Sequence, residues 1–220
     1  MVQAYSRSIR GLDEVFRRLS FGCNGGRHPN SSTAVCIGLI LNYFDRTVDT
    51  RILPEALKAE ELQGSIWEVR RYPHTTMLHD YLIRRCHLEP GTFGCWGKDA
   101  ISKFKQHWQA KPWTPGVIVR GTFGGFGKDG AWTLIKQEID ASRPAMITVP
   151  RRAAKTLQGR WHSMVVCGYR ITPFGHRELL VHTGRYGDSV KGSRAQVFYI
   201  SLEKVLCSYR FDVGLLSTGF

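Results

Sequence analysis

The chain lacks any apolar run long enough to cross a bilayer, and its first ten residues are polar, unlike the apolar core of a secretory leader. We therefore expect no membrane span, no classical signal peptide, and a cytoplasmic location or delivery by a leaderless route. Acidic residues are few: 31 Lys and Arg against 18 Asp and Glu give a net charge of +13. This excess favours acidic partners, although basic residues spread along the whole chain are also typical of a solvated surface.

The sequence also lacks the spacings that mark disulfide frameworks, zinc sites and phosphate loops. No C-x-x-C pair occurs, and Lys128 in the glycine-rich stretch 121–130 is followed by Asp129 rather than by Ser or Thr. We expect a reducing compartment, no obligatory disulfide, no metal site and no cofactor. The six cysteines are Cys23, Cys36, Cys86, Cys95, Cys167 and Cys207.

The chain has enough apolar residues for one folded domain, since 42% of its 220 residues are hydrophobic. Hydrophobic periodicity predicts an α+β fold, with a helical lobe at about 1–112 and an antiparallel sheet lobe at about 113–220. The expected helices are 10–19, 33–44, 54–63, 75–87, 98–109 and 131–141. The expected strands are 117–121, 145–149, 162–169, 178–183 and 196–201.

The stretch 30–46 organises this prediction. From Ala34 to Phe44 only Asn42 is strongly polar, and a helix that is apolar on nearly every side is a buried one. Ser31, Ser32 and Thr33 are suitable N-cap residues. The N-terminus of such a helix carries unpaired N–H groups and partial positive charge, which favour a developing anion.

Several short motifs, in order, resemble the papain-like cysteine peptidases, closest to the bacterial branch of bacteriocin-leader peptidases and streptopain-type enzymes. In that family an Asn-x-Cys motif opens a buried helix, and a later His opens a strand. The resemblance spans roughly residues 20–205 and implies a papain-like fold of two lobes. The matching residues are Asn30-Ser31-Ser32, Tyr43-Phe44-Asp45, Trp132, Ile135-Lys136, Glu138-Ile139-Asp140, Arg143-Pro144, Trp161-His162, Val165-Val166, Gly168-Tyr169 and Leu179 to Gly184.

The resemblance implies a catalytic site made of three side chains. Ser32 occupies the position of the nucleophilic cysteine, and His162, at the start of a strand, would be the general base. His182 would orient the imidazole of His162, with Thr183 or Asp188 as the alternatives for that role. His162 and His182 also fit the simpler interpretation that each is a structural histidine in a sheet.

Further residues would border the same cleft. The family places a Gln upstream of the nucleophile as an oxyanion donor, and this chain has none, so Asn24 or His28 would substitute for it. Arg151 and Arg152 precede His162 in a basic loop, where they would bind an acidic substrate segment or remain solvated.

The implied function is a thiol hydrolase, specifically a cysteine endopeptidase acting on one protein substrate, with toxins and effectors as fitting roles. The chain as written should be nearly inactive, because a serine hydroxyl is a much poorer nucleophile than a low-pKa thiolate. Ser32 is either a replacement of the cysteine or the mark of a pseudo-peptidase or unusual serine enzyme. The alternative is a non-catalytic module that binds acidic protein or nucleic acid, although a protein or peptide partner is favoured.

Overall fold

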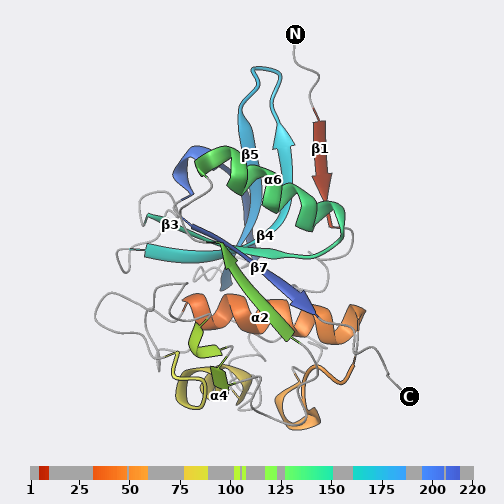
Figure 1. The fold of residues 1–220 in the computed structure, drawn as a ribbon, viewed down its shortest axis with the longest axis vertical. Helices are drawn as coiled ribbons and strands as arrows, with labels where there is room; N and C mark the ends of the chain where they lie inside the picture. The colour runs from red at the N-terminus through yellow and green to blue at the C-terminus, as the bar shows by residue number, and fades with distance from the viewer. Residues whose placement is uncertain are drawn as a thin grey trace.

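The computed structural model describes residues 5–9, 32–48, 50–58, 77–88, 102–104, 106–107, 117–122, 127–150, 161–186, 195–205 and 207–213. Within these residues seven strands form one antiparallel sheet in the order β2-β7-β3-β4-β5-β6, and β1 pairs with β4 (Figure 1). The strands are β1 (Tyr5–Ser8), β2 (Val117–Thr122), β3 (Ala145–Pro150), β4 (Trp161–Ile171), β5 (Arg177–Tyr186), β6 (Ala195–Ser201) and β7 (Cys207–Val213).

Helices cover both faces of the sheet. Figure 1 shows α6 (Gly127–Asp140) on one face and α2 (Ser32–Thr47) on the other, with α4 (Met77–Arg84) on the far side of α2. Two 3₁₀ turns, Glu55–Leu57 and Leu202–Lys204, complete the named elements, and residues 102–104 and 106–107 are helical. None of the described helices is both long and apolar enough to cross a membrane.

The helix predicted from the apolar stretch is present and buried, as expected. Every residue of α2 from Thr33 to Asp45 is buried, so the helix forms a layer between the sheet and α4. The helix continues past Asp45 to Thr47, and the Asp45 side chain is buried. The Asp45 Oδ1 accepts a hydrogen bond from the backbone N–H of Leu53 at 2.8 Å, although burial raises the pKa of this carboxyl above its usual value.

The α+β class and the antiparallel sheet are confirmed, and all five predicted strands are present, with no end more than three residues from its predicted position. Two strands, β1 and β7, were not predicted. Because β1 comes from the N-terminal end and pairs with β4, the sheet is not confined to the second half of the chain. Residues 127–130, predicted as part of a glycine-rich loop, form the first turn of α6. The predicted helix 54–63 is wrong in its described part, which forms only the 3₁₀ turn Glu55–Leu57 followed by an extended Lys58. The predicted helix 10–19 lies outside the described residues, as do parts of 54–63, 75–87 and 98–109.

The motif residues of α6 and β4 hold these two elements together. The Trp132 ring packs edge-on against the Tyr169 ring with centroids 5.3 Å apart, and the Tyr169 hydroxyl donates to Asp140 Oδ1 at 2.8 Å. Gly168 leaves room for β1, since a Cβ there would lie 2.7 Å from the backbone oxygen of Arg7. These residues of the resemblance therefore have structural roles.

The end of α6 offers a direct test of backbone strain. Ser142 has φ 58°, and the N–H groups of Ser142 and Arg143 donate to the carbonyls of Ile139 at 3.0 Å and Glu138 at 2.8 Å, which is a Schellman cap. Glycine adopts this conformation without steric cost, so Ser142→Gly is expected to raise the free energy of unfolding by about 0.5–1 kcal/mol, measured by urea denaturation. As a control, Gln137→Gly, at an exposed position inside the same helix, should lower it by a similar amount. A loss of stability in Ser142→Gly would contradict the assigned strain.

Candidate functional site

The N-terminus of α2 contacts the beginning of β4. The backbone N–H of Ser163 donates to Ser32 Oγ at 3.2 Å, and the hydroxyls of Thr33 and Ser163 lie 2.8 Å apart in a buried hydrogen bond. These two contacts join residues that are 131 and 130 positions apart in the sequence. They fix the first turn of the buried helix against the residue that follows His162.

A local opening of the sheet explains why this amide contacts a side chain. The described pairs between β4 and β5 begin at Val165 and His182, whereas β3 pairs with β4 from Trp161 onward. The first part of β4 is therefore matched by β3 on one side, which leaves room for α2 on the other. Ser163 N–H donates there to Ser32 rather than to a neighbouring strand.

Buried hydroxyls gather behind this contact. Thr148 is the strand partner of Ser163, so its side chain lies on the same face of the sheet as the Thr33–Ser163 pair. Thr33, Ser163 and Thr148 are each 3–4% exposed. The Thr148 hydroxyl has no hydrogen-bond partner in the described part of the chain, so the cluster retains one spare donor.

His162 lies beside this contact in the chain and is 3% exposed. Successive residues of a strand point to opposite faces, so Ser163 faces α2 and His162 faces the side that α6 covers. The structure thus brings the backbone of His162 next to Ser32. Strand alternation directs the imidazole away from residue 32, so the role of His162 as the base requires the side chain to turn and belongs to the proposal below.

The strand register does not bring His182 to His162. His182, fully buried, is paired with Val165 on β4 and Val197 on β6. Continuing that register by three residues makes Arg185, not His182, the position opposite His162. Three residues span about 10 Å along a strand and also reverse the face, so His182 lies on the α2 face of the sheet. This geometry gives no support to the orienting role expected of His182.

The other expected site residues fall outside what can be placed. Asn24, His28, Arg151, Arg152 and Asp188 lie outside the described residues. Thr183 belongs to β5, but its side chain is not described. Cys36, one helical turn after Ser32, is fully buried among apolar residues, as the sequence predicts.

The electrostatics of the α2 N-terminus suit an anion better than a cation. The first turn of α2 contains no acidic side chain, so nothing in that turn neutralises the partial positive charge of its N–H groups. Among the residues that the structure describes, no group of three or more His, Cys, Asp or Glu side chains is placed to hold a metal ion. The described part of this site can therefore stabilise negative charge through amides and hydroxyls.

Sequence reasoning missed Ser163 and Thr148, although a signal for both was present. Each is the polar residue within an otherwise apolar stretch, in Ala-Met-Ile-Thr-Val at 145–149 and Ser-Met-Val-Val at 163–166. A hydroxyl inside a buried strand needs a partner, which indicates a polar contact across the sheet face. A scan against protein-family models and a search of curated proteins found no match to this chain.

Proposed function

We propose that this protein has the scaffold of a papain-like thiol hydrolase, specifically a cysteine endopeptidase acting on a protein substrate, and that Ser32 leaves it nearly inactive. The observation that carries the proposal is the hydrogen bond from Ser163 N–H to Ser32 Oγ. Ser32, the candidate nucleophile, lies at the N-terminus of the buried helix α2. The contact places it against Ser163, which follows the candidate base His162 at the start of β4.

In the proposed reaction, the side chain of residue 32 attacks the carbonyl carbon of the scissile peptide bond. Its proton passes to the imidazole of His162, which must first turn from the opposite face of β4 toward residue 32. The imidazole then returns the proton to the leaving amine, and water hydrolyses the resulting acyl-enzyme. The amide of Ser163 and the first N–H groups of α2 lie near the developing negative charge. A serine without a strong base reacts slowly by this route, whereas a cysteine thiolate does not need a base at the moment of attack.

One observation favours the alternative, a non-catalytic binding module. The register separates His182 from His162, so His182 is not placed to orient the His162 imidazole. A papain-like scaffold that has lost its nucleophile and its orienting residue would retain only binding. Under the hydrolase proposal the third role falls to Thr183 or Asp188.

The two functions differ in what Ser32→Cys does. We expect the Ser32→Cys protein to cut a peptide library at defined positions, detected by mass spectrometry as new N-termini. The Ser32→Cys/His162→Ala protein should lose at least 100-fold in rate, on the order of a general-acid contribution, because His162 no longer protonates the leaving amine. The parent chain, which retains all six cysteines, is the matched control. If the folded Ser32→Cys protein neither cleaves peptides nor acquires an electrophile at residue 32, the hydrolase proposal fails and the binding module remains.

A further inference from the structure

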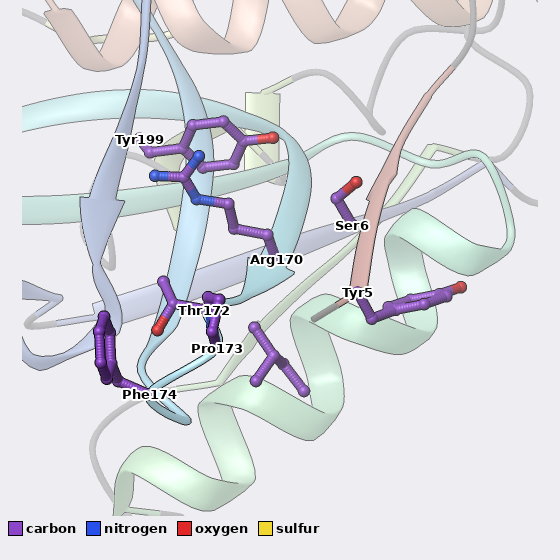
Figure 2. A pocket seen from close by; sticks show the side chains of 8 residues that line it. Tyr5, Ser6, Arg170, Thr172, Pro173, Phe174 and Tyr199 are labelled. Atoms are coloured by element: carbon purple, nitrogen blue, oxygen red, sulfur yellow. The ribbon is translucent and has the colours of Figure 1, made fainter. Parts of the chain in front are cut away.

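A second candidate site lies at the opposite end of β4. A pocket of about 520 Å³ is lined by Tyr5, Ser6, Arg170, Pro173, Phe174 and Tyr199, among others (Figure 2). Arg170 follows Ser163 by seven residues, which places the pocket about 23 Å along the strand from the contact with Ser32. The residues that line it belong to β1, the β4–β5 hairpin and β6. Figure 1 shows β1 and this hairpin on the side of the molecule away from α2. The pocket is therefore separate from the proposed catalytic site.

The arginine in this pocket is held in a fixed plane. The guanidinium carbon of Arg170 lies 3.7 Å from the centroid of the Tyr199 ring, and its Nε donates to Glu178 Oε2 at 2.5 Å. Figure 2 shows the guanidinium lying across the Tyr199 ring inside the pocket. Since the Arg170 side chain is still 41% exposed, a second planar group can stack on it.

An exposed aromatic ring lies at the rim of this pocket. The described residues expose three large hydrophobic side chains, and two of them, Phe174 (86% exposed) and Tyr5 (47% exposed), are among the pocket residues. The Tyr5 ring points away from Arg170 (Figure 2) and packs against the Tyr169 ring with centroids 5.9 Å apart. Leaving the Phe174 side chain in water forgoes about 1.5–3 kcal/mol of burial energy, so its exposure at a pocket indicates a bound partner.

We propose that this pocket binds single-stranded nucleic acid, whose bases stack on Phe174 and on the Arg170–Tyr199 pair. Single strands offer successive planar faces and a polyanionic backbone, which match aromatic platforms on a chain of net charge +13. A volume of about 520 Å³ accommodates a base. An acidic protein would satisfy the charge but would not use the exposed rings.

The phosphates have cations available around the same hairpin. Arg7, Arg170 and Arg177 lie on β1, β4 and the start of β5, and their partners are Asp140, Glu178 and Asp129. All three arginine side chains are 39–46% exposed, and exposed ion pairs are worth only about 0–1 kcal/mol each. Backbone phosphates can therefore compete for these guanidinium groups, and binding should weaken steeply as salt is added.

The test is a titration of the full parent chain into fluorescein-labelled single-stranded oligo-dT and oligo-U of about 12 nucleotides, followed by anisotropy at several salt concentrations. Phe174→Ala is expected to weaken binding about 5- to 150-fold, the range for losing one stacked base. Phe174 is 86% exposed, so the variant should fold normally. The matched control is Val48→Ala, which truncates the third exposed apolar side chain, 47% exposed, at the far end of α2.

A second pair of variants separates stacking from bulk charge. Arg170→Ala and Arg84→Ala each remove one positive charge, but Arg84 is an exposed residue of α4, remote from the pocket. We expect Arg170→Ala to weaken binding at least fivefold more than Arg84→Ala. The proposal is overturned by absence of binding at low salt, by equal affinity for duplex DNA, by equally effective competition from polyglutamate, or by equal effects within either pair. Because the parent chain is used, none of these outcomes bears on the hydrolase proposal.

Discussion

Ser32→Cys is expected to create a thiol that reacts with iodoacetamide near pH 6 about ten times faster than an ordinary cysteine. A helix N-terminus beside a histidine lowers a thiol pKa from about 8.5 to between about 3.5 and 7.5. At a pKa of about 5.5 the thiolate fraction near pH 6 rises more than a hundredfold, but the lower basicity of that thiolate reduces its intrinsic reactivity by about fifteenfold to thirtyfold. The absence of an acidic side chain in the first turn of α2 and the amide of Ser163 both act in this direction.

The pH profile of alkylation separates the two causes. The rate should reach half its plateau well below pH 8.5, and His162→Ala in the Ser32→Cys protein should move that midpoint upward, because it removes the imidazolium that stabilises the thiolate. The parent chain provides the background from its six cysteines, of which Cys36, Cys86 and Cys167 are buried. A midpoint at about 8.5 in both variants would show that neither the helix nor His162 acts on residue 32. A lowered midpoint that His162→Ala leaves unchanged would assign the effect to the helix alone and remove His162 from the site.

The burial of α2 could be predicted because it needs only local composition. Eleven residues from Ala34 to Phe44 with one strongly polar side chain cannot be solvated, so the helix must be covered on all sides. The strands β3 and β4 were predicted for the same reason. In contrast, β1 is four residues long with all four side chains exposed, and such a segment leaves no apolar pattern in the sequence. Its place in the sheet depends on Gly168, where the missing side chain admits the backbone of Arg7 and Ser8.

The juxtaposition of the candidate site is harder to predict than the elements that carry it. The order and spacing of motifs led to the expectation that Ser32 and His162 lie on facing elements. The structure brings Ser32 to Ser163 at the start of β4, whereas strand alternation turns the His162 side chain to the opposite face. The role of His182 depended on register. A hairpin turn and an irregularity between Val166 and Gly168 set that register, and neither can be counted from the 20-residue separation of the two histidines.

Replacing Arg143 by methionine is expected to lower the free energy of unfolding by about 3 kcal/mol, the largest stability effect of any single ion pair described here. Glu138 lies on α6 and is 1% exposed, and both of its carboxylate oxygens accept from Arg143, Oε2 from Nε at 2.6 Å and Oε1 from Nη2 at 3.0 Å. Methionine keeps much of the aliphatic stem but leaves the buried carboxylate without this charge partner. The effect should appear as a lower urea midpoint with an unchanged slope.

Two controls distinguish this buried pair from an ordinary surface ion pair. Lys136→Met removes the partner of the 31%-exposed Asp140 in the same helix. It should lower the free energy of unfolding by less than about 1 kcal/mol, because both side chains of this pair are already partly hydrated in the folded protein. Glu138→Gln combined with Arg143→Met should recover part of the loss, since the neutral amide no longer needs a cation. A loss below about 1 kcal/mol in Arg143→Met, equal to that in Lys136→Met, would show that the Glu138 carboxylate is solvated. The Glu138–Arg143 ion pair would then not explain why Glu-Ile-Asp and Arg-Pro occur together between α6 and β3.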